Sequence, residues 1–358
     1  MDNLTKDSIY NLSRTALEDY FVSKNLQKFR ATQVFEALYR QKKSSFEEIN
    51  NINKDVKKIL SDDYSFNFLK EVKKEVSSDG TTKFLFELED ENLIETVLMV
   101  HPYGYSVCVT SQVGCNMGCK FCASGQVKKI RNLTASEMVL QVLTIDNHLN
   151  QMDKNVSHVV IMGIGEPFDN YDNVMEFIKI INDAKGLSIG ARHITISTCG
   201  LVPKIKEFSN FPLQVNLAIS LHFPNDELRS KYMPINKKYK LDELLDAIKY
   251  YYDKTNRRVT FEYILLHNIN DSISHAKELA NILKGINAYV NLIPYNSTTS
   301  EFLRTTPERR DAFFDYLCKQ GINAIVRKEH GSEIDAACGQ LRVKTMALKN
   351  KKSDTDKN

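Results

Sequence analysis

Strand-like and helical segments alternate between residues 105 and 320, and this alternation restricts the possible folds more than any other feature. The predicted strands lie at 105–111, 158–162, 192–197, 215–221, 258–265 and 288–293, and the predicted helices at 134–148, 171–184, 202–207, 241–253, 272–284 and 307–320. The strand at 158–162 (HVVIM) is a continuous apolar run, which is typical of a parallel sheet covered on both faces. Six strand–helix units therefore predict an α/β protein with a full or partial (β/α)6 barrel.

The residues before the barrel follow other patterns. Residues 13–60 are helical in periodicity, and Ser45 with Glu48 predicts a capping box before a short helix. Strand patterns at 68–77, 83–89 and 92–100 surround the turn signal Ser78-Asp79-Gly80. The predicted domains are a helical accessory domain (1–65), a β-hairpin extension (66–104), the barrel domain (105–343) and a disordered basic tail (344–358).

Three cysteines lie close together just after the first barrel strand. Residues 114–125 (GCNMGCKFCASG) contain Cys115, Cys119 and Cys122 at C-x3-C-x2-C spacing. A four-iron, four-sulfur cluster held by three cysteines keeps one iron open to a small molecule, whereas a structural zinc site needs four protein ligands. Cys108 or His101 could supply that fourth ligand, so a zinc site remains the alternative interpretation at this point.

The composition is that of an ordinary globular protein, with 42% hydrophobic and 26% charged residues. The first 20 residues contain no apolar signal core, and no apolar run approaches a membrane span, so we expect a cytoplasmic protein. Seven cysteines, three of them clustered, do not form a secreted disulfide framework. The net charge of +3 is only mildly basic, which permits an RNA partner without requiring one.

Barrels of this kind carry out chemistry at the carboxyl ends of their strands, where this chain has polar residues and glycines. The segments in question are 115–122 after the first strand, 163–167 (GIGEP) after the second, 197–200 (STCG) after the third, 220–222 (SLH) after the fourth and 294–296 (PYN) after the sixth. Each of these short segments alone is a common turn or cap. Their shared position after successive strands predicts one site at one rim of the barrel.

These motifs resemble the radical S-adenosylmethionine (SAM) enzymes and, within them, the RlmN/Cfr family of RNA methyltransferases. The resemblance covers nearly the whole chain. It rests on IETV (94–97), SVCVTSQVGC (106–115), CKFC (119–122), IMGIGEP (161–167), ITIST (194–198), ISLH (219–222), MPIN (233–236), NLIPYN (291–296) and IDAACGQL (334–341). The combination with DAACGQL is specific to this family. The implied fold is a partial (β/α)6 radical SAM barrel with a small helical module before it.

The resemblance also implies two cofactors. A [4Fe-4S] cluster would be held by Cys115, Cys119 and Cys122, and its open iron would bind SAM, two molecules of which would be used per turnover. A glycine permits close backbone approach to a ligand, and a carboxylate suits the SAM amino group. The implied SAM-binding residues are Gly165, Glu166, Ser197, Ser220, Leu221, His222 and Asn296.

The family's chemistry gives roles to three further residues. Cys338 matches the cysteine that is first methylated by SAM and then forms a covalent adduct with the adenine of the RNA. Cys108 matches the cysteine that attacks Cys338 and releases the product, with a transient disulfide, and Glu95 matches the base that removes the adenine proton. No role is predicted for Cys199, and Cys318 is predicted to lie in the core.

The implied substrates are 23S rRNA, at the peptidyl-transferase centre, and the adenosine next to the anticodon in tRNA. RlmN-type enzymes methylate adenine C2, and Cfr-type enzymes, which confer antibiotic resistance, methylate C8. Pro167 after Gly165 and Glu166 favours the C2 type, because Cfr-type chains tend to have alanine there. The implied electron donor is a protein such as flavodoxin. The alternatives are C8 methylation and, more remotely, a zinc-stabilised RNA-binding protein.

Overall fold

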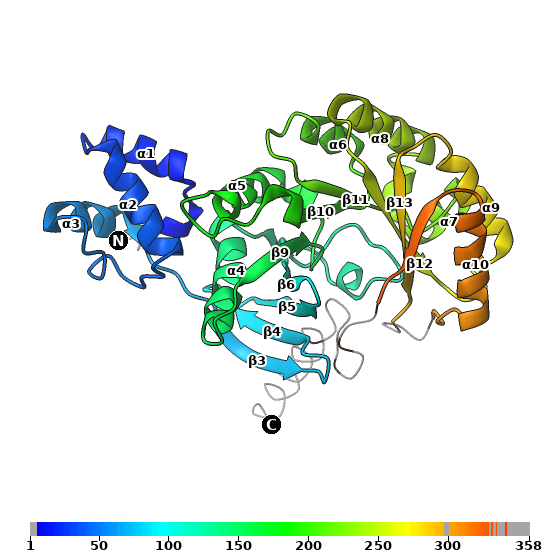
Figure 1. Ribbon diagram of the computed structural model, residues 1–358, viewed down its shortest axis with the longest axis horizontal. Helices are drawn as coiled ribbons and strands as arrows, with labels where there is room; N and C mark the ends of the chain where they lie inside the picture. The colour runs from blue at the N-terminus through cyan, green and yellow to red at the C-terminus, as the bar shows by residue number, and fades with distance from the viewer. Residues whose placement is uncertain (1–5, 297–300, 329–330, 332–333, 335–340, 342–358) are drawn as a thin grey trace, which may run out of the picture.

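The computed structural model describes residues 6–296 and 301–328, together with residues 331, 334 and 341 (Figure 1). A single sheet with the strand order β14-β13-β12-β11-β10-β9-β6-β5-β4-β3 lies at the centre of this described part. The sheet consists of β3 (Lys70–Val76), β4 (Thr82–Glu87), β5 (Leu93–His101), β6 (Gly104–Cys108), β9 (Val156–Ile161), β10 (Ile194–Thr198), β11 (Asn216–Ser220), β12 (Val259–Leu265), β13 (Ala288–Pro294) and β14 (Asn323–Val326).

In this sheet, β6 and the strands β9 to β14 pair in parallel and form an open barrel, and helices cover its outer face (Figure 1). The covering helices are α4 (Ala135–Asn150), α5 (Tyr171–Asn182), α6 (Val202–Phe208), α8 (Leu241–Thr255), α9 (Ile273–Ile282) and α10 (Pro307–Lys319). The predicted partial (β/α)6 barrel is therefore confirmed. The sequence prediction omitted α7 (Asp226–Tyr232) and the edge strand β14, because both are short and carry little apolar periodicity.

Several helices begin where a local side chain accepts a hydrogen bond from one of the first backbone N–H groups. Thr134 and Glu137 form the predicted capping box at the start of α4. Strands such as β9 and β10 contribute buried Val and Ile side chains to the same core as the inner faces of α4 and α5. In the described part of the chain, no helix is long and apolar enough to cross a membrane.

The N-terminal module contains α1 (Arg14–Ser23), α2 (Lys28–Tyr39) and α3 (Lys54–Asp63), and the short strands β1 (Asp7–Ser8) and β2 (Tyr64–Ser65) pair beside them. The predicted capping box at Ser45 and Glu48 is wrong. The Glu48 carboxylate accepts hydrogen bonds from the backbone and side chain of Ser44 within a turn, and Asn53 caps α3 instead. The module docks beside α5, where Arg14 forms an ion pair with Asp183 at 2.9 Å (Figure 1).

The strands β3, β4 and β5 extend the barrel sheet in antiparallel fashion, because β5 pairs with β6 and β6 with β9. Phe84 and Phe86 of β4 belong to the core shared with α4. Side chains alternate between the two faces of a strand, so Lys83 and Leu85 lie on the opposite face. The positions of Cys338 and the tail 344–358 lie outside the described residues.

Candidate active site

The three clustered cysteines lie in one loop whose two ends are tied together. The loop connects β7 (Gln112–Val113) with β8 (Arg131–Asn132), which pair with each other in antiparallel fashion. Cys115 then donates its backbone N–H to the carbonyl of Val127 at 2.9 Å. The cysteines therefore lie on a loop whose two ends are held together by backbone hydrogen bonds.

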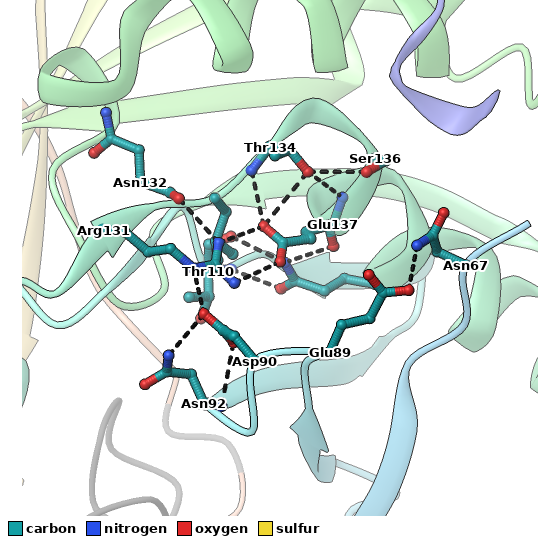
Figure 2. Close-up of polar contacts among 12 residues, drawn as sticks. Asn67, Glu89, Asp90, Asn92, Thr110, Arg131, Asn132, Thr134, Ser136 and Glu137 are labelled. Carbon is teal, nitrogen blue, oxygen red and sulfur yellow. Dashed lines mark hydrogen bonds and ion pairs between the residues drawn. The ribbon is translucent and has the colours of Figure 1, made fainter. Parts of the chain in front are cut away.

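Arg131 fixes the base of this loop to two other elements (Figure 2). Its guanidinium donates to Asp90, in the turn between β4 and β5, at 2.6 Å, and to both carboxylate oxygens of Glu137 in α4 at 2.8 and 2.7 Å. The hydrogen bond from Arg131 holds the pKa of Asp90 down at about 2. Two-oxygen contacts of this type restrict geometry as well as adding energy, so the loop keeps a defined position relative to the extension.

Two glycines permit the tight path of the loop. Gly118 has a φ of +67°, a conformation that side chains disfavour. At Gly125, an added Cβ would lie 2.8 Å from the backbone oxygen of Cys119, closer than ordinary van der Waals contact allows. The backbone around Cys119 therefore packs directly against Gly125.

We expect Gly125→Ala to disturb the cysteine loop. The clash is with backbone and cannot be relieved by a side-chain rotation, so the free energy of unfolding should fall by about 1–3 kcal/mol and iron content per chain should fall with it. Gly190→Ala is the matched control, because a Cβ there meets nothing within 4 Å. Iron analysis and thermal unfolding of both variants check this, and equal iron content in the two would contradict it.

The three thiols lie near one another in a partly buried environment. Burial raises the pKa of the Cys115 thiol to about 12, with smaller contributions from the charges of Cys122 and Glu166. Burial likewise raises the pKa of Cys119, and Cys122 and Cys115 add to the effect. Neutral thiols in such a place become thiolates when a metal centre balances their charge.

The donor set fits an iron–sulfur cluster better than a single metal ion. Among the described residues, no three His, Cys, Asp or Glu side chains are close enough to bind one ion. Sulfur ligands of one zinc ion lie at about 2.3 Å from the metal and therefore close to one another. In a four-iron cluster each cysteine binds a different iron, so the thiolates stand further apart. Within the described residues, these thiols therefore lack the further ligands that a structural zinc site needs.

Glu166 lies beside the cysteine loop. Its carboxylate accepts hydrogen bonds from the backbone N–H groups of Cys199 at 2.7 Å and Phe168 at 3.0 Å. Burial raises the pKa of Glu166, and these hydrogen bonds oppose the effect. Gly165 has a φ of +116°, and a Cβ there would meet Gln112 at 2.7 Å. The GIGEP turn thus packs tightly against Ser111 and Gln112, just before the cysteine loop.

His222 also packs against this loop. Its ring packs edge-on against Phe121, between Cys119 and Cys122, with 5.0 Å between centroids. The backbone N–H of Ile264 donates to its Nδ1 at 3.2 Å, and burial, then the charge of Arg229, lowers its pKa to about 3. His222 is therefore a neutral imidazole. Its φ of +60° is unusual for a residue with a side chain, and such strain is concentrated at functional sites.

The other predicted SAM-binding residues follow neighbouring strands. Ser197 and Ser220 lie at the ends of β10 and β11, with 3.3 Å between their hydroxyl oxygens. Leu221 is fully buried and follows Ser220 directly. Asn296 is exposed and lies two residues after the end of β13. The structure thus brings Glu166, Ser197, Ser220 and His222 to the rim that carries the cysteine loop.

Arg229 is a buried residue near this site that the sequence reasoning missed. It is 1% exposed, and its guanidinium donates to the backbone oxygen of Cys199 at 2.6 Å and to Asn236 at 3.0 Å. No carboxylate within the described ranges forms an ion pair with it. Its positive charge opposes the rise in the pKa of Cys119. In DELRSKY (226–232) it looked like an ordinary surface charge, so no sequence signal pointed to it.

The predicted base and resolving cysteine share one face of the sheet. Val97 of β5 lies opposite Cys108 of β6, and Glu95, two residues before Val97, is on the same face. Glu95 is only 3% exposed and forms an ion pair with Lys83. Leu341, three residues after Cys338 in the sequence, packs against Leu85 and Leu93 of the neighbouring strands. Lys83 was not predicted as a site residue.

Cys199 and Cys318 differ from each other in environment. Cys199 is buried near Phe121 and Tyr232, among the residues that pack against Cys119. Cys318 was predicted to lie in the core, and this is wrong because the residue is exposed. The apolar stripe of α10 consists of Phe313 and Leu317, and the next residue lies about 100° further round the helix.

Comparison with known proteins agrees with this geometry. A sequence model described as the radical SAM superfamily matches residues 109–280, and one described as the ribosomal RNA large subunit methyltransferase N-terminal domain matches residues 8–65. A radical SAM methyltransferase from Sphaerobacter thermophilus, whose crystal structure is known, is 41% identical, with a TM-score of 0.88 over 93% of this chain and 98% of that chain. Fold, cysteine loop and matches together define a radical SAM protein, a class that uses a [4Fe-4S] cluster and SAM.

Two relatives show which family within this superfamily the chain belongs to. Both are called probable dual-specificity RNA methyltransferase RlmN. The one from Enterococcus faecalis is 54% identical over 349 residues, covering 96% of this chain and 98% of its own. The one from Acholeplasma laidlawii is 56% identical over 335 residues, covering 93% and 98%. The chain belongs to the RlmN family of radical SAM RNA methyltransferases.

Proposed function

We propose that this protein methylates C2 of a specific adenosine in 23S rRNA, at the peptidyl-transferase centre, and of the adenosine next to the anticodon in tRNAs. The observation that carries this proposal is the identity of more than half the residues to RlmN relatives along nearly the full length of both chains. Pro167 after Gly165 and Glu166 also favours C2 over C8. Methylation of C8 is the second candidate, and the relatives' names do not favour it.

In this proposal the chain's own residues bind and orient the cofactors. Cys115, Cys119 and Cys122 hold the cluster, Glu166 with Gly165 receives the SAM amino group, and Ser197, Ser220, Leu221, His222 and Asn296 line the rest of the SAM site. The neutral state of His222 supports its role. Its Nδ1 accepts from the Ile264 N–H, so the proton is on Nε2, which can donate a hydrogen bond to a ribose oxygen. When bound, the cluster and SAM supply the radical that removes a hydrogen atom from methylated Cys338.

Cys338 is the proposed methyl carrier. Adenine C2 carries no acidic proton and is electron-poor, so direct transfer of a methyl cation to it fails. The carbon radical attached to the Cys338 sulfur instead bonds to C2. The adduct then loses one electron, equal to the one that the electron donor supplied, and Glu95 accepts the C2 proton. The Cys108 thiolate next attacks the Cys338 sulfur and forms a disulfide, and the released carbon keeps the electron pair of the broken bond and takes up a proton to complete the methyl group. The shared face of Glu95 and Cys108, and the return of the chain to that face at Leu341, support this arrangement.

Further parts of the proposal concern the setting of the reaction. We propose a cytoplasmic enzyme that receives electrons from a donor such as flavodoxin. The division into an accessory domain (1–65), an extension (66–104), a barrel domain (105–343) and a basic tail (344–358) is also part of the proposal. It is supported by the separate N-terminal match at residues 8–65.

Mass spectrometry of RNA tests the position of methylation. Digested 23S rRNA and tRNA from a strain lacking this gene should contain no 2-methyladenosine, and restoring the gene should bring it back in both. Synthetic 2-methyl- and 8-methyladenosine serve as retention standards. Appearance of 8-methyladenosine instead would contradict the proposed position, and no methylated adenosine at either position would contradict the proposed reaction.

A further inference from the structure

Lys83 and Glu95 form an ion pair inside the protein. The ammonium nitrogen of Lys83 lies 3.0 Å from a carboxylate oxygen of Glu95, and the two side chains are 0% and 3% exposed. Lysine and glutamate are rarely buried so completely. Such a pair also gains little stability, because removing both charges from water costs several kcal/mol per ion. A pair of apolar residues would suit the fold at least as well, so the ion pair calls for another explanation.

Strand pairing places the pair next to the proposed chemistry. Leu85 of β4 lies opposite Glu95 of β5, and Lys83 is two residues before Leu85 on the same face. Cys108 lies opposite Val97, and Cys108, Val97 and Met99 pack together on this face. Of the two titratable side chains of β4 on that face, Lys83 and Glu87, Lys83 is the one that reaches Glu95.

The backbone of Glu95 is held as well. The hydroxyl of Thr110 donates to the Glu95 carbonyl at 2.5 Å, and Gln141 of α4 receives a hydrogen bond from the backbone N–H of Thr110 at 2.9 Å. The neighbouring Thr96 donates to the same Gln141 oxygen at 2.8 Å from the opposite face of the strand. The strand therefore fixes the Cα position of Glu95, and the Lys83 ammonium contacts one oxygen of its carboxylate.

We propose that Lys83 is the positioning residue for Glu95 in proton removal, an inference that rests on the proposed role of Glu95 as the base. The Lys83 ammonium lies 3.0 Å from one carboxylate oxygen of Glu95 and holds that oxygen in place. The proton that leaves C2 then forms an O–H bond with Glu95, and the electron pair of the broken C–H bond stays on the adenine ring.

This assignment predicts a block at one stage of the reaction. Lys83→Met and Lys83→Gln should keep the cluster and methylate Cys338 normally, because neither step uses Glu95. Both variants should form 2-methyladenosine at least about 100-fold more slowly, in the range typical of general-base catalysis, and should accumulate a covalent RNA–protein species. Lys83→Arg retains the charge and should restore part of the turnover.

The experiment uses the reconstituted full chain with total tRNA from the strain lacking this gene. Iron and sulfide content, the mass of the methylated protein, the RNA–protein species on denaturing gels and the yield of 2-methyladenosine are measured for each variant. Glu95→Gln is run in parallel. Because Glu95 is the proposed proton acceptor, we expect this variant to stop at the same stage, before the C2 proton is removed.

The possible results separate the two claims. Normal turnover by Glu95→Gln would overturn the base assignment itself. A block in Glu95→Gln together with normal turnover in Lys83→Gln would overturn only the role of Lys83. Loss of the cluster or of Cys338 methylation in both Lys83→Met and Lys83→Gln would also overturn it, since Lys83 would then serve the fold.

Discussion

Replacing Cys119 by alanine is expected to remove the iron–sulfur cluster and to reduce RNA methylation to background. Cys119 is the central member of the cysteine loop, and burial together with the charges of its two partners raises its pKa. With only two thiolates left, the loop cannot hold a four-iron cluster. Iron and sulfide analysis, the visible absorption spectrum and reductive cleavage of SAM measure the loss.

Cys199→Ala is the matched control for this change. Cys199 is a buried thiol in the same group of side chains as Cys119 and Phe121. Its backbone N–H, which holds Glu166, is present in any substituted residue. We expect Cys199→Ala to retain iron and sulfide. A Cys119→Ala chain with full iron content would contradict the cluster assignment, and loss of iron in Cys199→Ala would show that Cys199 is a ligand.

Cys108→Ala should stop the reaction after the adenine of the RNA has become covalently attached to the protein. The thiol of Cys108 lies on the sheet face that it shares with Glu95, so it is placed to attack a sulfur bound there. Without this thiol the bond between the Cys338 sulfur and the methyl carbon has no nucleophile to break it. A stable RNA–protein adduct should therefore accumulate on denaturing gels, with almost no free 2-methyladenosine.

Two further variants test which cysteine carries the RNA in that adduct. Cys318→Ala removes an exposed thiol on α10 and should turn over normally. The double variant Cys108→Ala/Cys338→Ala should retain the cluster but form no adduct, because the methyl carrier is gone. Free turnover by Cys108→Ala would rule out its resolving role, and an adduct in the double variant would place the RNA on another residue.

Much of the fold could be predicted from local patterns. The strands β9 to β13 and the helices α4, α5, α8, α9 and α10 lie within a few residues of their predicted bounds. Apolar periodicity and capping residues are local properties, and they remain visible in one sequence. The two wrong predictions were also local. The Glu48 carboxylate accepts a hydrogen bond from Ser44 and forms no capping box. Cys318 lies one residue past the apolar stripe of its helix.

The buried charges near the site could not be predicted in the same way. Arg229 stands in a short polar helix, and Lys83 in a strand where alternation alone would permit an exposed lysine. Burial of such groups depends on what packs over them. The polar partners of these groups are equally distant in sequence or hidden from local patterns: Arg229 donates to the Cys199 backbone and to Asn236, and Lys83 pairs with Glu95 on the next strand.

The sequence alone determined the order of strands and helices, the three-cysteine loop and the rim on which it lies, because each follows from spacing along the chain. The tertiary structure decided which distant residues became neighbours. The antiparallel registers of β4, β5 and β6 put Lys83, Glu95 and Cys108 on one face, and these registers depend on the barrel sheet to which β6 belongs. A one-residue change in one of these registers would turn the side chains of the shifted strand to the opposite face and separate the three residues.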